Sequence, residues 1–85
     1  MIKLNFRDIA EIDFIDPMYH EVNELSLNHN LLTTLDGIEQ FKNIKILHLN
    51  FNRIDSWNEL LKIGNPLHVQ ELSIKGNPNL EISSE

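Results

Sequence analysis

The sequence predicts an α/β solenoid of about four turns, in which each turn holds one short strand and one return segment. The first reason is that residues 24–35 and 46–57 match when one segment is laid on the other at an offset of 22 residues. The second is their shared spacing, apolar-x-apolar-x-x-Asn-x-apolar, because a fixed period in the twenties with this spacing is typical of stacked repeats. The matched pairs are Leu25/Leu47, Leu27/Leu49, Asn30/Asn52, Leu32/Ile54 and Leu35/Trp57.

Residues 1–21 predict a degenerate first turn that caps the repeats. At an offset of 23 residues their apolar positions fall on those of the second turn, whereas Arg7 takes the place of the asparagine. Terminal repeats tend to depart from the pattern because one of their sides faces water. An amphipathic helix over residues 8–14 is the alternative, since three isoleucines also recur at near-helical spacing, and Pro17 should break any regular element. The isoleucines are Ile9, Ile12 and Ile15.

The second turn spans residues 22–43. Its strand, residues 24–28, alternates apolar and polar side chains, so one face should be buried and the other should point outward. The chain then bends after Asn30, and Asp36-Gly37 supplies a further turn. Apolar residues at every third position suit 3₁₀ turns and extended crossings better than a regular α-helix. These residues are Leu32, Leu35, Ile38, Phe41 and Ile44.

The third turn, residues 44–68, contains a capping-box pattern that predicts a short α-helix over about residues 57–63. In this pattern the Ser56 hydroxyl accepts a hydrogen bond from the Glu59 amide, and the Glu59 carboxylate returns one to the Ser56 amide. Gly64-Asn65-Pro66 should end the helix.

The fourth turn, residues 69–85, places Leu72 and Asn77 on the repeat positions. We expect nothing after Ile82 to cover the last core layer, which would leave Leu80 and Ile82 at an exposed edge that can template association. All four turns together form one domain, residues 1–85.

The repeated residues themselves should be structural. Stacking places the leucines in continuous rows between turns, where each turn buries its neighbour's apolar face. Trp57 occupies a leucine position and is therefore expected to pack in the core. An asparagine inside a bend offers both a donor and an acceptor, which suits the column Asn30, Asn52 and Asn77.

The pattern Leu-x-Leu-x-x-Asn-x-Ile/Leu-x-x-Leu at 22 residues resembles the short intracellular class of leucine-rich repeats, as in the phosphatase-1 regulatory subunit and the leucine-rich light chain of axonemal dynein. The resemblance covers residues 22–80 well and residues 1–21 only by their apolar positions. It implies a short parallel sheet on the concave face, with helical and extended segments on the convex face. It also implies that the asparagine column satisfies backbone groups of neighbouring loops. Residues 54–60 and Gly76-Asn77-Pro78 further resemble the repeat region of tubulin cofactors, although nothing in them is tied to tubulin.

Function should lie between the leucines, on side chains that point out of the sheet. Ile46, His48 and Phe51 in the central turn are candidate anchors for a partner protein, because exposed apolar and aromatic groups often serve that purpose. The alternative for Phe51 is that it packs over the loop edge. The predicted protein-binding residues are Glu24, Ser26, Asn28, Ile46, His48, Asn50, Phe51, Glu71, Ser73 and Lys75.

Charge and composition narrow the classes of partner. The chain carries 13 acidic and 7 basic side chains, a formal charge of −6 that disfavours nucleic acid and anionic membranes. Much of the acidic excess lies early in the chain, where it is either a solvated surface or a docking face for a basic partner. There is no cysteine, and the start lacks the long apolar run of a signal peptide, so we expect a cytoplasmic or nuclear protein.

No constellation of catalytic residues is evident. Of the four histidines, only His29 and His48 should approach each other across neighbouring turns, which disfavours a metal site. No phosphate loop or nucleophile motif occurs, so we expect neither a cofactor nor an enzyme. The sequence therefore predicts a protein-protein interaction module that binds on its concave face. The alternative is a structural spacer or assembly unit that self-associates through its C-terminal edge.

Overall fold

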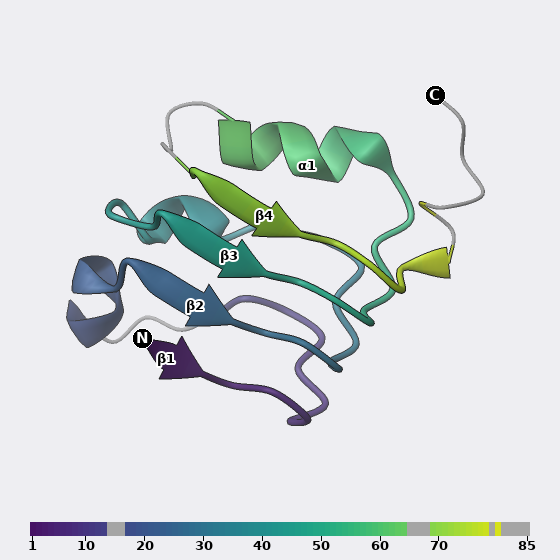
Figure 1. Cartoon of the computed structure of the whole chain (residues 1–85), viewed down its shortest axis with the longest axis horizontal. Coiled ribbons are helices and arrows are strands. Elements are labelled where there is room, and N and C mark those ends of the chain that lie inside the picture. The colour runs from purple at the N-terminus through teal and green to yellow at the C-terminus, as the bar shows by residue number, and fades with distance from the viewer. Residues whose placement is uncertain (14–16, 65–68, 79, 81–85) are drawn as a thin grey trace.

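Four short strands form one parallel sheet in which consecutive strands are neighbours (Figure 1). They are β1 (Ile2–Lys3), β2 (Glu24–Ser26), β3 (Ile46–His48) and β4 (Glu71–Ser73). The computed structural model describes residues 1–13, 17–64, 69–78 and 80. Leu25 pairs with Ile2 on one side and with Leu47 on the other, and Leu47 pairs with Leu72. The register that the repeat offsets predict is therefore confirmed.

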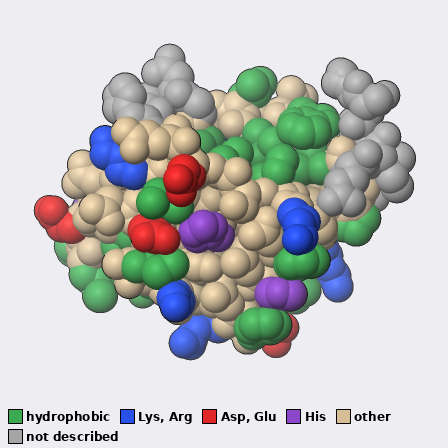
Figure 2. All heavy atoms as spheres, viewed as in Figure 1, with side chains coloured by type: hydrophobic (Ala, Val, Ile, Leu, Met, Phe, Trp, Pro, Cys, Tyr) green, Lys and Arg blue, Asp and Glu red, His purple; other side chains and the backbone are tan. Residues whose placement is uncertain are grey.

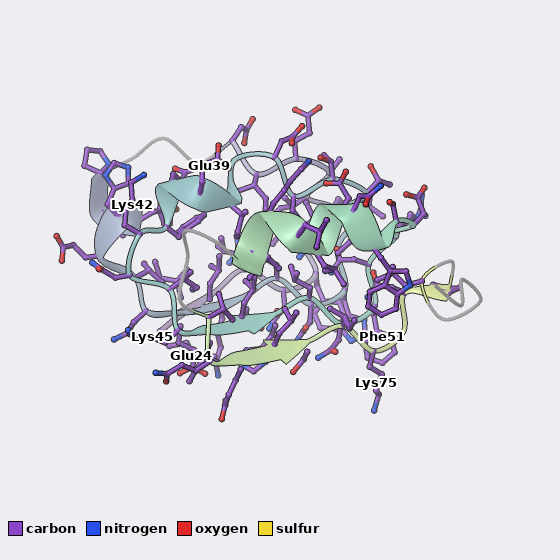
Figure 3. All side chains as sticks on the ribbon, turned by 90° about the horizontal axis from the view of Figure 1, so that it is seen from above. Glu24, Glu39, Lys42, Lys45, Phe51 and Lys75 are labelled. Atoms are coloured by element: carbon purple, nitrogen blue, oxygen red, sulfur yellow. The ribbon has the colours of Figure 1, made fainter. Side chains whose placement is uncertain are left out.

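Three helical segments connect the strands. They are the 3₁₀ helices η1 (Pro17–Glu21) and η2 (Ile38–Gln40) and the α-helix α1 (Trp57–Gly64). Figure 3 shows η2 and α1 on the same side of the strands. The sheet therefore has a covered face and an open face. The predicted helix over residues 57–63 is confirmed to within one residue, and the 3₁₀ turn of η2 follows the predicted bend at Gly37, whose φ is 98°.

In the first return segment, the alternative of a helix and the expected break at Pro17 are both wrong. Residues 8–13 are neither helix nor strand, so the alternative of an amphipathic helix is wrong for the described part of residues 8–14. Pro17 begins η1 and does not break it, since the fixed φ of proline suits the first position of a helix and its missing N–H costs nothing there. Ile12 is 4% exposed and joins the core. Ile15 and Asp16 lie outside the described residues.

Four leucines of the repeat, Leu25, Leu27, Leu47 and Leu49, form one buried cluster with the apolar residues of the return segments, as the repeat predicts. Leu80, which we expected at an exposed edge, is 1% exposed and belongs to this cluster, whereas Ile82 lies outside the described residues. Leu72 is 39% exposed because β4 is an edge strand in the described sheet. The cluster contains Ile12, Leu25, Leu27, Leu32, Leu35, Ile38, Phe41, Ile44, Leu47, Leu49, Ile54, Ile63 and Leu80.

Trp57 is 43% exposed, so the expectation that it packs in the core is wrong. In the second turn the matching position is Leu35, which lies in a non-helical segment and is fully buried. Trp57 is the first residue of α1, and the helical backbone directs its side chain differently. A position shared in sequence is therefore not shared in space once one copy becomes helical.

The column of asparagines is buried and bridges neighbouring turns, as predicted. Asn30, Asn52 and Asn77 are 4%, 3% and 0% exposed. The Oδ1 of Asn52 accepts the N–H of Leu32 at 3.1 Å, and its Nδ2 donates to the carbonyl oxygen of Leu27 at 2.9 Å. Within the described residues, no buried side-chain nitrogen or oxygen lacks a hydrogen-bond partner. The column therefore satisfies backbone groups that stacking would otherwise leave unpaired.

Neither bond of the predicted capping box forms at the start of α1, although Ser56 still caps the helix. The Ser56 Oγ accepts the N–H of Asn58 at 3.1 Å, and the N–H of Glu59 donates to the carbonyl oxygen of Ser56 at 3.0 Å. The Glu59 carboxylate turns to the preceding turn, where its Oε1 accepts the N–H of Leu35 at 2.8 Å and a bond from the Nζ of Lys62 at 2.8 Å. Both predicted bonds, from the Glu59 amide to the Ser56 hydroxyl and from the Ser56 amide to the Glu59 carboxylate, are therefore wrong. An amide and an ammonium together hold the carboxylate more strongly than the Ser56 amide alone would.

We expect Glu59→Gln to lower stability at neutral pH, by an amount that shrinks as the pH falls through the lowered pKa of Glu59. The hydrogen bond from Lys62, and then that from the Leu35 amide, hold the pKa of Glu59 below its ordinary value of 4.5. A carboxyl with a lowered pKa in the folded state stabilises the fold above its ordinary pKa, and this contribution is lost as the pH falls through the lowered value. Glutamine keeps an acceptor for Leu35 but loses the charge, at a cost of about 1 kcal/mol or less for a partly exposed group.

Thermal melts at a series of acidic to neutral pH values measure this effect. The midpoint of Glu59→Gln should lie below that of the wild type at pH 7, and the gap should narrow as the pH falls below the ordinary carboxyl pKa. Glu39→Gln, on the exposed surface of η2, is the matched control. Its thermal midpoint should differ from that of the wild type by the same small amount at every pH. A gap between Glu59→Gln and the wild type that stays constant with pH would contradict the role of the carboxylate charge.

Candidate functional site

The open face of the sheet carries most of the predicted protein-binding residues. In Figure 3, Glu24 and Lys75 extend from the side of the strands that lies away from α1, whereas Glu39 and Lys42 lie on the covered side. Figure 2 views the open face and shows a histidine near its middle with acidic side chains close by. The face is therefore a mixed surface of charged, polar and apolar groups.

Two rows of outward residues cross β2, β3 and β4 in register. Ile46 pairs with Glu24 on one side and with Glu71 on the other, which puts an apolar side chain between two carboxylates. His48 lies two residues further along β3, and its Nε2 is 3.4 Å from the Oε2 of Glu24. Ile46 and His48 are both partly exposed, so the predicted centre of the site is accessible.

Three of the predicted contact residues instead hold the turns together. Ser26 is only 3% exposed, and its hydroxyl donates to the Oδ1 of Asn5 at 2.7 Å. A chain of similar bonds then runs from turn to turn. The same Oδ1 of Asn5 accepts the N–H of Asn28 at 2.8 Å. In turn, the Oδ1 of Asn28 accepts the N–H of Asn50 at 2.7 Å, and the Oδ1 of Asn50 accepts the N–H of Lys75 at 2.8 Å. Ser26 is therefore not available to a partner, and Asn28 and Asn50 use their carbonyl oxygens inside the molecule.

This second column of asparagines has a signal in the sequence that the prediction overlooked. Asn28 and Asn50 recur at the 22-residue offset of Asn30 and Asn52, and Lys75 follows Asn50 by 25 residues, as Asn77 follows Asn52. Asn5 precedes Asn28 by the 23 residues that separate the first turn from the second. When one residue type recurs in phase with the leucines, it indicates a structural role. When the residue type varies between copies, it indicates that the fold does not constrain that surface position. By that criterion the predicted contacts that vary between turns remain the stronger candidates.

Aromatic rings form a stack where the strands end. The rings of Phe6 and His29 are 4.3 Å apart between centroids, and those of His29 and Phe51 are 4.5 Å apart, with interplanar angles of 10° and 11°. Each of these residues lies three positions after its strand and has a φ of 59° or 60°. Gly76 holds the same place after β4, with a φ of 76°. We call Phe6, His29 and Phe51 the aromatic row.

Backbone hydrogen bonds hold the aromatic row in place. The N–H groups of His29 and Phe51 donate to carbonyl oxygens of the next turn, those of Asn50 and Lys75, at 2.9 Å and 2.7 Å. Phe51 therefore packs at the loop edge against His29 and Gly76, which was the alternative to a freely exposed anchor. Even so, 42% of its surface is exposed. A residue with a side chain rarely adopts positive φ, so the bonds and the stacking must together offset a local cost of about 1–2 kcal/mol at each position.

Gly76→Ala should displace the ring of Phe51. A Cβ at Gly76 would lie 2.3 Å from the Cδ1 of Phe51, closer than two carbons can approach. We expect a loss of about 2 kcal/mol, the sum of the positive-φ cost and the disturbed stacking. In a Phe51→Ala background the same substitution should cost only the positive-φ part, which a double-mutant cycle by urea denaturation measures. Equal costs in both backgrounds would mean that the ring does not rest on Gly76.

An open groove runs beside the aromatic row. Besides the three rings, its walls include Leu31, Arg53 and Pro78. In Figure 2, a histidine near the lower edge of the open face has hydrophobic side chains on both sides, with basic side chains near them. We call this feature the edge groove. The sequence prediction included Phe51 but missed the groove. The rest of the groove is formed by residues that follow the bends, namely Leu31, Arg53 and Pro78.

No cluster of potential metal ligands is found among the described residues. No group of three or more such side chains occurs among them, and none of their helices is long and apolar enough to cross a membrane. His29 and His48, the two histidines expected to approach each other, have different neighbours. His29 stacks between two phenylalanines and His48 faces Glu24.

Comparison with known proteins agrees with the repeat. Residues 20–62 match the family model described as Leucine Rich repeats (2 copies). The tubulin-specific chaperone E of Dictyostelium discoideum is 33% identical over 72 residues, an alignment that covers 68% of this chain. The chain spans only 14% of the length of that relative. No solved structure matches.

Proposed function

Since the chain belongs to the leucine-rich repeat family, we propose that it is a non-enzymatic module that binds a partner protein on the open face of its sheet. The observation that carries the proposal is the row in which Ile46 stands between Glu24 and Glu71, with His48 beside it. This arrangement exposes an apolar centre with a polar rim, which is the common anatomy of a protein interface. Stacked repeats of this kind generally present their sheet as an extended binding surface.

The proposal keeps the variable residues of the predicted site except Phe51, which lies in the edge groove, and leaves out those that join the turns. The rest of the solenoid of about four turns is then a frame that sets the spacing of these side chains. The proposed contact residues are Glu24, Ile46, His48, Glu71, Ser73 and Lys75. We also propose that the protein acts in the cytoplasm or nucleus, in line with its lack of cysteine.

Ile46→Lys should weaken partner binding without unfolding the protein. A lysine at this position stands between two carboxylates in the same row, so cross-strand attraction favours the fold. Loss of an apolar anchor at the centre of an interface costs about 2 kcal/mol or more, which is roughly thirtyfold in affinity. Quantitative mass spectrometry of proteins captured by the immobilised chain, from an extract of its own organism, measures the loss.

The matched control is Leu61→Lys, which makes the same type of change at a residue of α1 that is 72% exposed. It should leave capture unchanged, because α1 lies on the covered side of the sheet. If Leu61→Lys abolished capture and Ile46→Lys did not, the binding surface would be the helical side and the proposal would be wrong. The relative's name identifies it as tubulin-specific, so purified tubulin is a sensible first candidate for the same assay.

A structural assembly unit is the second candidate function. The observation in its favour is that β4 has one described neighbouring strand, β3, and exposes 39% of Leu72. An edge strand of this kind can pair with another chain. The burial of Leu80 removes one of the two residues on which this alternative depends. Sedimentation over a hundredfold concentration range tests it, since only this function predicts self-association that Leu72→Lys abolishes.

A further inference from the structure

We propose that the edge groove binds a short acidic segment of another protein that carries an aromatic side chain. This inference rests on the proposed function, because it names the class of partner, but it concerns a different surface from the row around Ile46. Three observations support it: the exposure of the aromatic row, the way in which the backbone holds the rings, and the sign of the charges around the groove.

The first observation is exposed aromatic area next to other apolar side chains. Phe6 is 73% exposed and Phe51 is 42% exposed, and they share the groove with Leu31 and Pro78. Large apolar groups gathered at one place on a surface indicate an interaction site more strongly than scattered ones. An inserted aromatic ring would remove this area from water and would meet ring edges at favourable geometry.

The second observation is that the rings are already held in place. Stacking at 4.3 Å and 4.5 Å, together with the backbone bonds of the turns, holds the three side chains before any ligand arrives. A partner therefore pays little conformational entropy to order this surface, which favours binding of a short segment. The aromatic row ends at Phe51 without a further side chain, because position 76 is glycine and a Cβ there would lie too close to the ring of Phe51.

The third observation is local positive charge on an acidic protein. The whole chain has a formal charge of −6, yet Arg53 lines the groove. Lys75 lies on the turn next to Phe51, and its carbonyl oxygen accepts the N–H of Phe51. Figure 3 shows the Lys75 side chain near Phe51, extending away from the sheet. Arg7 follows Phe6, and Asp8 is the acidic neighbour at that end. Carboxylates of a bound segment would therefore favour the end with Arg53 and Lys75.

The probe is a fluorescein-labelled peptide of eight residues with one phenylalanine between runs of glutamate. Fluorescence anisotropy at physiological ionic strength, where charges more than about 8 Å apart are largely screened, measures its dissociation constant with the whole chain. We expect the wild type to bind it, and Arg53→Glu to weaken binding by about tenfold or more, as for loss of a charge pair of 1.4 kcal/mol. Lys42→Glu is the matched control with the same change in net charge, on the covered side of the sheet, and should change binding less than about twofold.

Changes to the peptide test the apolar half of the proposal without altering the fold. Phenylalanine replaced by alanine should abolish most binding, and glutamates replaced by lysines should abolish it entirely. Amide resonances of His29, Phe51 and Gly76 should shift on titration in a two-dimensional NMR spectrum. Equal weakening by Lys42→Glu and Arg53→Glu, or shifts confined to residues of β3, would overturn the groove as the site.

Two other occupants have distinct outcomes, and each would overturn the proposal. A single-stranded oligonucleotide that displaces the peptide and binds more tightly would assign the groove to phosphate recognition. Self-association that Arg53→Glu abolishes would assign it to a second copy of this chain. The proposed function is tested separately: if Ile46→Lys lost its protein partners while no peptide bound the groove, the open-face function would stand and this inference would fall.

Discussion

Asn52→Ala is expected to destabilise the protein by about 2–4 kcal/mol, because it leaves the buried Leu32 amide without a partner. The side chain of Asn52 is 3% exposed, so water cannot easily replace it. The carbonyl oxygen of Leu27 keeps a bond from the Nδ2 of Asn30 at 3.0 Å, which limits the loss to one orphaned donor and the lost bonds. In a small domain this lowers the thermal midpoint by at least about 8 °C.

Asn43→Ala is the control for Asn52→Ala. Asn43 is exposed, and its Nδ2 donates to the carbonyl oxygen of His20 at 3.3 Å, so its loss should cost less than about 0.5 kcal/mol. Urea denaturation monitored by circular dichroism measures both variants. Equal midpoints for Asn52→Ala and the wild type would mean that the buried column does not hold the turns together.

Gly37→Ala should have an effect of similar size by a different mechanism. A Cβ at position 37 would lie 2.2 Å from the carbonyl oxygen of Ile12, and the φ of Gly37 is 98°. The positive φ alone costs about 1–2 kcal/mol with a side chain present, and the contact with a backbone atom adds to it, because neither segment moves without shifting its turn. We expect a total loss of at least about 2–3 kcal/mol, measured by urea denaturation.

The contrast with Gly76→Ala makes this prediction specific. At Gly76 the obstacle is the ring of Phe51, and truncating that ring should remove part of the cost. At Gly37 the obstacle is a main-chain oxygen, so Ile12→Ala should add its own cost and recover nothing. If the double variant of Gly37 and Ile12 were more stable than additivity predicts by 1 kcal/mol or more, the side chain and not the oxygen would be the obstacle.

The candidate site was predictable as far as it depends on the alternation of strand residues. Ile46, His48 and Glu71 lie on the open face because the period of a strand is two and their neighbours in sequence are leucines. Ser26 was not predictable from that rule, since its burial comes from Asn5 and Asn28 closing over it from two turns. The edge groove was also missed, because its rings come together through positive φ values after three different strands.

The sequence by itself determined the register of the sheet and the burial of Leu25, Leu27, Leu47 and Leu49, and its resemblance to a repeat family implied the bridging role of the asparagines. A period of 22 to 25 residues repeats one set of contacts, so each turn specifies its own neighbour. Only the tertiary structure decided the surroundings of Trp57, the direction of the Glu59 carboxylate and the stacking of His29 between two phenylalanines. These features depend on which group of another turn lies nearest, and the spacing of residues along one turn carries no information about that distance.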